Sequence, residues 1–322
     1  MRLRRPLVRR LAAGGSTLCA VSVFLATAGA PVAANAATPN AATPSSSSGI
    51  IRAVGAENEY ADVLAQIGGR YVSVSSILNN PNTDPHTFEA STRVAQEVSQ
   101  AQLIVQNGVG YDHFMNNMES ASPSSLRHVI VVQHVLGLPT ATPNPHLWYN
   151  PTTMAPVARA MASALSQIQP SHATYFHAQL STFISSLRPW LQAIAAFKKV
   201  HAGTSVAVTE PVSNYVLQSM GMRIATPFVF QADIMNGVDP APQAITQEDA
   251  LFTRHRVKVF CYNQQVVSSL TKSIRDTASR AGVPIVGVYE TMPTGYHYQS
   301  WMLAEVHALS AAVEHGTSTE HL

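Results

Sequence analysis

The chain has little cysteine and little charge for its length. Only two of its 322 residues are cysteines, Cys19 and Cys261, and charged side chains make up 12% of the total. Cys19 lies in an N-terminal segment that we expect to be removed, so only one cysteine would remain. This excludes a fold held together by intrachain disulfides. We expect Cys261, in the apolar run Val-Phe-Cys-Tyr, to be a buried strand residue. The overall composition is typical of a compact globular protein.

A broad basic face is also missing. Five of the 20 lysines and arginines lie in the first ten positions, and without residues 1–36 there remain 15 basic against 18 acidic residues, a net charge of −3. Nucleic-acid binding depends on neutralising phosphates with lysine and arginine. The charge balance therefore argues against a nucleic-acid partner.

Long apolar runs are absent as well. The longest near the N-terminus, from about Leu18 to Ala28, is too short to span a bilayer comfortably. Arginines precede it, and Ala34-Asn35-Ala36 is a small-x-small pattern, so residues 1–36 are predicted to be an export signal that is cleaved after Ala36. A membrane anchor is the alternative. Cys19 lies at the start of the apolar run, where lipid attachment is not expected. The mature chain is predicted to be periplasmic or otherwise extracytoplasmic.

The remaining sequence alternates between strand and helix patterns. Residues 37–49 are of low complexity and predict a disordered tether. Strand-like runs at 51–55, 71–78, 103–106 and 128–133 predict an N-terminal lobe over 50–170. Runs at 205–209, 223–229, 257–262 and 284–289 predict a C-terminal lobe over 200–322, and 171–199 reads as one long linking helix. The prediction is an α/β fold of two lobes of mainly parallel β-sheet flanked by helices and joined by that helix.

Two histidines and two glutamates follow strand-like segments. His86 lies in residues 84–89 (Asp-Pro-His-Thr-Phe-Glu) and His146 in residues 144–148 (Asn-Pro-His-Leu-Trp), while Glu210 and Glu290 come directly after apolar runs. Ligands of parallel sheets bind beyond the carboxyl ends of the strands, often in a cleft between lobes. Two imidazoles and two carboxylates form a complete ligand set for a divalent transition metal. The sequence predicts a metal site at these four residues.

Other interpretations of the same residues remain open. A histidine in a loop is most often solvated, and His297 is the best substitute ligand. Glu89 either orients His86 or is a helix N-terminal carboxylate. A metal-dependent hydrolase could use His86, His146 and Glu210 as ligands and Glu290 as general base. The chain has no His-Glu-x-x-His pair, phosphate-binding glycine loop or nucleophile elbow, and four protein ligands leave no position for substrate. The fold could also serve adhesion without metal.

The segments around these four residues resemble those of a known family, the metal-binding (zinc/manganese) solute-binding proteins of ABC importers, cluster A-I type. Residues 84–89 and 144–148 are similar to its two histidine segments, with Asn144 in place of the usual Asp. Residues 209–215 resemble the third ligand segment, and 287–290 the fourth, where Glu290 replaces the usual Asp. The similarity extends over about residues 50–315.

The resemblance implies a monomeric receptor that binds one divalent transition metal ion between two lobes and hands it to the membrane permease of an ABC importer. It implies no catalysis. A site with two carboxylates suits manganese or ferrous iron better than a site made mostly of imidazoles would. Zinc also binds histidine and carboxylate. The histidine-rich loop of zinc-specific members is absent from residues 119–143. The ligand types therefore lean towards manganese, with zinc as the alternative.

Overall fold

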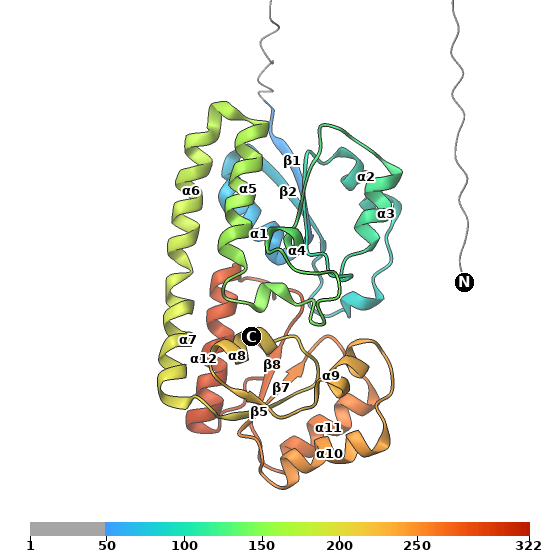
Figure 1. The fold of residues 1–322 in the computed structure, drawn as a ribbon, viewed down its shortest axis with the longest axis vertical. Helices are drawn as coiled ribbons and strands as arrows, with labels where there is room; N and C mark the ends of the chain where they lie inside the picture. The colour runs from blue at the N-terminus through green and yellow to red at the C-terminus, as the bar shows by residue number, and fades with distance from the viewer. Residues whose placement is uncertain (1–48) are drawn as a thin grey trace, which may run out of the picture. The chain divides into compact units, whose positions relative to one another are not determined.

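The computed structural model describes residues 49–322, so the predicted export signal and nearly all of the predicted tether lie outside the described residues. The described part contains two four-stranded sheets, each of them fully parallel, with helices packed around them (Figure 1). The strand orders are β2-β1-β3-β4 and β6-β5-β7-β8. The predicted fold class, two lobes of parallel sheet flanked by helices, is confirmed.

The first sheet and its helices take up the N-terminal part of the described chain. The elements are β1 (Ile51–Glu57), α1 (Asn58–Gly68), β2 (Val72–Leu78), the 3-10 turn η2 (Pro85–Thr87), α2 (Thr92–Gln100), β3 (Leu103–Gln106), α3 (Phe114–Ala121), β4 (His128–Val131), α4 (Val132–Val135), the 3-10 turn η3 (Leu147–Tyr149) and α5 (Met154–Ile168).

The second sheet and its helices follow the linking segment. The elements are α6 (Ala173–Ser186), α7 (Arg188–His201), β5 (Ser205–Val208), α8 (Asn214–Ser219), β6 (Arg223–Ile224), α9 (Phe228–Met235), α10 (Pro242–Thr253), β7 (Val259–Asn263), α11 (Ser269–Arg280), β8 (Ile285–Val288) and α12 (Tyr298–His315).

The inner strands of each sheet are buried on both faces, which is why β1, β3, β5 and β7 read as nearly continuous apolar runs. Along β1, Ile51 and Ala53 pack with residues of α1 and α5, whereas Val54 and Ala56 pack with residues of α2 and α3. The central strand β7 divides in the same way, since Cys261 faces the larger core and Phe260 faces the cluster beneath α9, α10 and α11. Cys261 is buried, as the sequence predicted.

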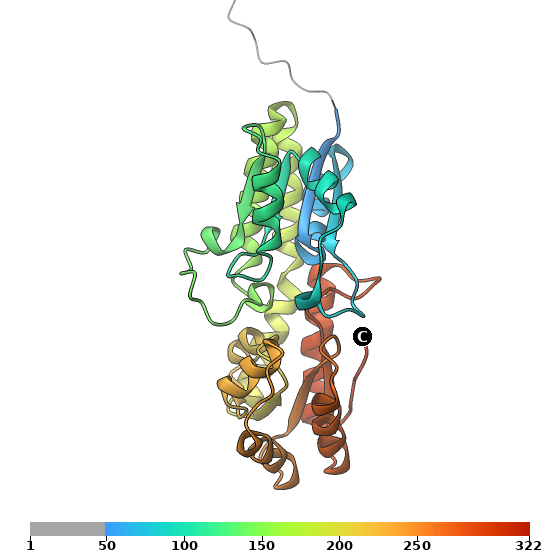
Figure 2. The same cartoon turned by 90° about the vertical axis from the view of Figure 1, so that its right-hand side faces the viewer.

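The linking segment runs along one side of both sheets, with α6 next to α5 and α1 and with α7 next to α12 (Figures 1 and 2). The single helix predicted over 171–199 is wrong in one respect, because α6 ends at Ser186 and α7 begins at Arg188. Pro189 explains the break, since a proline inside a helix has no N–H to donate and its ring clashes with the carbonyl four residues earlier.

The predicted strand at 223–229 is also mostly wrong. Only Arg223–Ile224 pairs as β6, and the apolar run from Phe228 starts α9 directly after Pro227. A short apolar run cannot by itself distinguish a strand from a buried helix, and Phe230 and Ile234 are buried one helical turn apart. Strands and helices still alternate in this part of the chain, so the second sheet remains parallel, as predicted.

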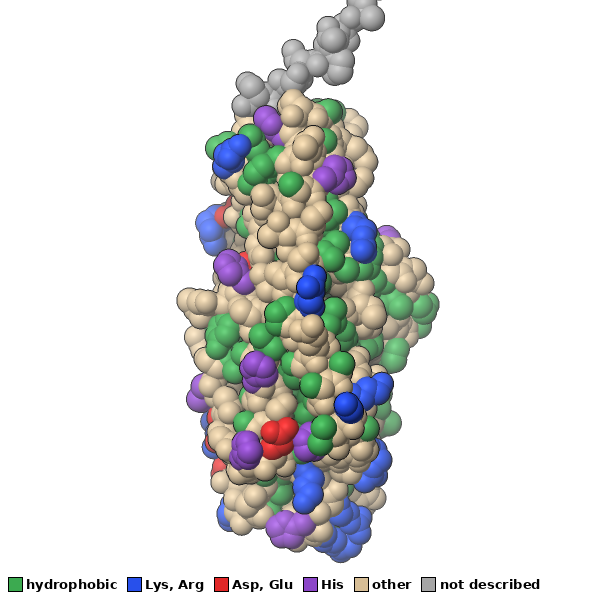
Figure 3. All heavy atoms as spheres, turned by 90° about the vertical axis from the view of Figure 1, so that its left-hand side faces the viewer, with side chains coloured by type: hydrophobic (Ala, Val, Ile, Leu, Met, Phe, Trp, Pro, Cys, Tyr) green, Lys and Arg blue, Asp and Glu red, His purple; other side chains and the backbone are tan. Residues whose placement is uncertain are grey.

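The described surface agrees with the composition. Where α6 and α7 face the viewer, charged and histidine side chains are scattered among neutral ones (Figure 3). Within residues 49–322, no helix combines the length and hydrophobicity needed to cross a bilayer.

Candidate metal centre

The four predicted ligands all lie beyond the carboxyl ends of strands. His86 is in the turn η2, which follows β2, and His146 directly precedes η3, which follows β4 and α4. Glu210 comes two residues after β5, and Glu290 two residues after β8. Because every strand in a sheet runs in the same direction, these positions lie together at the C-terminal end of the strands of each sheet.

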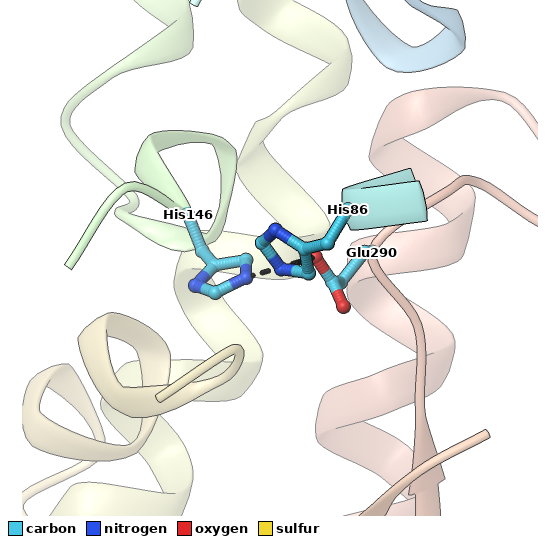
Figure 4. A group of neighbouring side chains, drawn as sticks. All are labelled: His86, His146 and Glu290. Carbon is cyan, nitrogen blue, oxygen red and sulfur yellow. Dashed lines mark hydrogen bonds and ion pairs between the residues drawn. The ribbon is translucent and has the colours of Figure 1, made fainter. Parts of the chain in front are cut away.

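Three of the four side chains converge. The Nε2 atoms of His86 and His146 each lie 3.1 Å from the same carboxylate oxygen, Oε2 of Glu290 (Figure 4). One potential ligand atom from each residue falls within 4.8 Å of the other two. His146 and Glu290 are buried, and the His86 side chain is 26% exposed. The two histidines come from the first sheet and the glutamate from the second, 144 positions beyond His146.

His146 is oriented by Asn144. The amide nitrogen of Asn144 donates to the backbone oxygen of Pro211, 2.8 Å away, so its Oδ1 must be the acceptor that lies 2.8 Å from Nδ1 of His146. Nδ1 therefore carries the proton of the neutral ring, and Nε2 presents a lone pair. The Asn144 amide thus performs the orienting role that a carbonyl or carboxylate performs behind metal-binding histidines.

His86 is fixed through its backbone. The side chain of Asp84 accepts a hydrogen bond of 2.8 Å from the backbone N–H of His86, and Pro85 stiffens the same turn. Burial alone would lower the pKa of His86, but the hydrogen bond and the charge of Glu290 outweigh it and raise the pKa above its ordinary value. In the metal-free protein His86 is thus the imidazole that more readily holds a proton against Glu290.

Burial and charge act in opposite directions on the other two members of the cluster. Burial lowers the pKa of His146, although Glu290 partly offsets the effect. Burial would raise the pKa of Glu290, but His146 and His86 outweigh it and hold the pKa well below its usual value. An anionic carboxylate therefore faces the lone pair of His146 across 3.1 Å. Two acceptors at this distance need a cation or a proton to bridge them.

Glu210 is buried near the cluster without joining it. It is only 2% exposed, and neither carboxylate oxygen has a hydrogen-bond partner. Burial raises its pKa well above the usual value, and the charge of Glu290 adds to the rise. Asn263 connects the two segments, because its backbone N–H donates to Oγ1 of Thr209, the residue before Glu210, and its side chain donates to Oε1 of Glu290. The placement of Glu210 among the ligands stays a prediction.

Two secondary candidates from the sequence lie elsewhere. His297 precedes α12, its Nδ1 contacts Oδ1 of Asp62 at 2.7 Å, and it is not among the three converging side chains. Glu89 is exposed, and no hydrogen bond joins it to His86 in the described structure. Asp84 fixes the backbone of His86 instead, and Ser91, not Glu89, caps α2.

Three residues around Glu290 were missed by the sequence analysis. The Tyr111 hydroxyl donates to Oε2 of Glu290 at 3.0 Å, and the Asn263 amide donates to Oε1 at 2.8 Å. Oε1 of Gln265 accepts the backbone N–H of Glu290 at 2.6 Å. Asn263 is the last residue of the apolar run that forms β7, so the strand-end rule that identified Glu210 and Glu290 could have found it.

Metal affinity is expected to fall as the solution is acidified. A proton on either Nε2 removes a ligand lone pair, so binding has to release it. The raised pKa of His86 means that competition begins at higher pH there than at His146, whose pKa is lowered. We expect a loss of about tenfold per pH unit once His86 is protonated, and a steeper loss once His146 is as well.

Competition with a chelator of known proton affinity, from pH 8 to pH 5, measures this dependence. His113→Gln is a suitable control, because His113 precedes α3 and is not among the converging side chains. Equal affinity at pH 7.5 and pH 5 would show that imidazole nitrogen does not bind the ion.

The donor set fits a divalent transition metal. Imidazole nitrogens and carboxylate oxygens are ligands shared by zinc, manganese and ferrous iron. Two carboxylates would cancel the charge of a divalent cation, which allows it to be buried. The unpartnered oxygens of Glu210 and the opposed acceptors of His146 and Glu290 are the polar atoms that such an ion would satisfy.

Solved structures share this fold. A crystal structure of ZnuA matches with a TM-score of 0.67 at 19% identity, covering 82% of this chain and 100% of that chain. FpvC from Pseudomonas aeruginosa, solved with Ni²⁺, matches with a TM-score of 0.68 at 18% identity and coverages of 84% and 99%. The periplasmic zinc-binding protein TroA from Treponema pallidum matches with a TM-score of 0.65 at 16% identity and coverages of 82% and 98%.

Sequence comparison agrees. A putative metal-binding protein of Thermotoga maritima is 23% identical over 225 residues, which cover 68% of this chain and 78% of that protein. Residues 54–312 match the family described as zinc-uptake complex component A, periplasmic. This match extends over most of the chain and confirms the resemblance seen in the ligand segments. The chain belongs to the family of the periplasmic component A of zinc-uptake complexes.

Proposed function

We propose that this protein is an extracytoplasmic receptor that binds one divalent transition metal ion, manganese or zinc, between two lobes and delivers it to the permease of an ABC importer. The observation that carries the proposal is the convergence of His86 and His146 on Oε2 of Glu290. Glu210, buried and without a hydrogen-bond partner, is proposed as the fourth ligand. Ferrous iron fits the same donors.

The ion is cargo in this proposal. A catalytic metal usually keeps one coordination position for water or substrate. Here three donor atoms already approach one another within 4.8 Å, and Glu210 lies beside them. A site that surrounds the ion with protein ligands is suited to binding and releasing the ion, because it leaves no coordination position for a substrate.

The hydrolase alternative is less well supported. It needs Glu290 to act as general base, one water molecule away from a metal held by the other three residues. Oε2 of Glu290 instead lies 3.1 Å from each imidazole nitrogen and belongs to the group of three converging donors. This distance supports a ligand role for Glu290 over that of a general base. Family membership in a metal-uptake component also favours binding over catalysis.

Location and partner follow from the same proposal. Residues 1–36 carry the pattern of a cleaved export signal, and the family description is periplasmic. A receptor outside the cytoplasm that releases a metal ion needs a membrane permease to receive it. We propose that the mature chain acts as a monomer beside that permease.

Metal analysis of the purified mature chain is the direct test. The protein is stripped with a chelator, then offered manganese, zinc or ferrous iron, and bound metal is counted by mass spectrometry of the digested sample. One ion per chain, with a rise in melting temperature that follows ion concentration, is expected. Failure of all three ions to bind above the level of a His86→Ala/His146→Ala double variant would reject the proposal.

Delivery needs a separate measurement. Uptake of a radiolabelled ion by cells without this chain is expected to recover with the wild-type chain and not with the double variant. Metal-dependent turnover of ester or amide substrates would instead favour the hydrolase.

A further inference from the structure

The side chain of Gln265 joins the segment that carries His86 to the segment that carries Glu290. Its Nε2 donates to the backbone oxygen of Thr83 at 2.8 Å, and its Oε1 accepts the backbone N–H groups of Glu290 at 2.6 Å and Thr291 at 2.8 Å. Thr83 follows β2 of the first sheet, whereas Gln265 and Glu290 follow β7 and β8 of the second. One amide therefore connects two ligand-bearing segments that come from different sheets.

This amide uses its full hydrogen-bonding capacity. Nε2 of Gln265 also donates to Oγ1 of Thr291 at 3.1 Å. A primary amide offers two N–H donors and an oxygen with two lone pairs, so all four are engaged. The amide orientation is fixed, because Oε1 faces two N–H groups and Nε2 faces the carbonyl of Thr83. Both N–H groups are buried, so the loss of Oε1 would leave two buried donors unpaired.

The turn after β7 holds Glu290 at two places. Asn263, the last residue of β7, donates from its side chain to Oε1 of Glu290 at 2.8 Å. Its Oδ1 accepts the backbone N–H of Gln265 at 3.0 Å, and Gln265 in turn accepts the backbone N–H of Glu290. The carboxylate and the backbone of Glu290 are thus both fixed relative to the end of one strand.

The path from Thr83 to His86 is short and stiff. Asp84 follows Thr83, and its side chain accepts the backbone N–H of His86 at 2.8 Å. The backbone oxygen of Asp84 accepts from the N–H of Thr87 at 3.2 Å and from its hydroxyl at 2.8 Å. Pro85 fixes its own φ between them. A displacement of Thr83 is therefore passed on to His86.

Few other contacts hold this connection between β2 and α2. Among residues 79–91 only Pro85 is buried, and a cavity of about 290 Å³ borders the connection. Beyond the histidine, Phe88 packs against Phe114 with 4.8 Å between ring centroids. A segment with few buried contacts opens at low cost in free energy. The bond from Gln265 therefore fastens the part before the histidine, as Phe88 fastens the part after it.

We propose that Gln265 is a positioning residue that holds His86 and Glu290 close together before the ion binds. This inference rests on the proposed function, since it concerns how the same site is pre-organised. A receptor whose ligands are already in place loses less binding free energy in ordering them. Without Gln265, the ion itself would have to order the His86 segment, and its affinity would be lower.

Gln265→Met tests the proposal, because methionine is similar in length and lacks the amide. Zinc and manganese affinities, measured by chelator competition, are each expected to fall about 10- to 100-fold, the usual cost of losing a partner behind a ligand. In the metal-free variant, amide hydrogen exchange measured by NMR is expected to accelerate over residues 79–88 and at Glu290 and Thr291. Exchange in β3 is expected to stay at the wild-type rate.

Gln265→Glu separates the two halves of the connection. The carboxylate can still accept the N–H groups of Glu290 and Thr291, but when ionised it has no hydrogen to donate to Thr83. Exchange at Glu290 and Thr291 is expected to stay near the wild-type rate, while exchange over residues 79–88 accelerates. The added charge attracts cations by itself, so exchange in the metal-free protein is the readout for this variant.

Gln264→Met is the matched control. It is the same substitution one position earlier, and the Gln264 side chain donates to the backbone oxygen of Glu320 at 2.7 Å. No hydrogen bond joins that side chain to Thr83 or Glu290 within the described residues. Wild-type metal affinity and wild-type exchange at Glu290 are expected.

The outcomes separate the two proposals. Wild-type protein that binds no ion rejects the proposed function itself. Wild-type protein that binds, together with a Gln265→Met variant of equal affinity, overturns the inference and leaves the proposed function standing. Exchange that accelerates equally throughout both sheets in Gln265→Met shows that Gln265 serves only the fold, and this also overturns the inference.

Discussion

Replacing His146 with alanine is expected to lower metal affinity on the order of 1000-fold, beyond the 10- to 100-fold cost of losing a partner behind a ligand. His146 is fully buried, its tautomer is set by Asn144, and its Nε2 is one of the three converging donors. Alanine leaves a space in the shell that Glu290 alone cannot fill. Isothermal titration with zinc and with manganese measures the loss.

The matched variants make this result specific. His315→Ala removes a side chain that is 71% exposed, and it should leave affinity at the wild-type value. Glu290→Gln keeps the shape of the side chain but removes its charge, and should approach the loss seen for His146→Ala. Glu210→Ala tests the fourth predicted ligand, because a loss of similar size supports coordination. Wild-type affinity in Glu210→Ala would remove Glu210 from the shell.

The metal-free protein is expected to become less stable as the pH rises from 5 to 8. Glu305 is buried in α12, where its Oε1 accepts from Trp301 at 3.1 Å and from Tyr149 at 3.2 Å while Oε2 has no partner. Burial outweighs these hydrogen bonds and raises the pKa of Glu305 to about 8. Burial likewise raises the pKa of Glu248 to about 8.

The sign follows from proton linkage. A carboxyl whose pKa is higher in the folded state binds more protons there, so its contribution to stability is complete below the unfolded pKa of 4.5 and is lost as the pH rises towards 8. Between pH 4.5 and pH 7, each pKa unit costs about 1.4 kcal/mol, so Glu305 is expected to remove about 3 kcal/mol from the free energy of unfolding.

Urea unfolding of the metal-free protein at pH 5, 6, 7 and 8 measures the trend. Glu305→Gln can still accept from Trp301, cannot ionise, and is expected to lose about 3 kcal/mol less than the wild type between pH 5 and pH 7. Glu89→Gln, at an exposed position, should follow the wild-type curve. Parallel curves for the wild type and Glu305→Gln would mean that Glu305 is not the source of the pH dependence.

The alternation of strands and helices was predicted correctly where every residue of a strand is buried. The run Leu103–Gln106 is buried throughout and forms β3 as predicted. The errors lie at Leu187 and at Phe228, where a proline decides the outcome: Pro189 interrupts the linking helix, and Pro227 precedes the first turn of α9. At both sites apolar residues recur on either side of the proline, and the proline's missing N–H, which the apolar pattern does not include, decides where one element ends.

The candidate site was predictable only in part, for a similar reason. His86, His146 and Glu290 follow strand-like runs, and that local signal was enough to group them. Tyr111 follows no such signal, because its hydroxyl reaches Glu290 over 179 positions of sequence. Asn263 reaches Glu290 because β7 lies between β5 and β8 in the sheet. Strand order depends on the whole fold, so no local sequence pattern predicts this contact.

The two sheets have the same strand order, β2-β1-β3-β4 and β6-β5-β7-β8, but each contributes a different type of side chain to the candidate metal centre. Every nitrogen donor of the converging group comes from the earlier half, and its carboxylate comes from the later one. If the proposed ion binds here, each half of the chain supplies only part of its ligands. In the proposed receptor a bound ion would therefore link the two halves, and a movement that separates His86 and His146 from Glu290 would weaken its coordination without disturbing the core of either sheet.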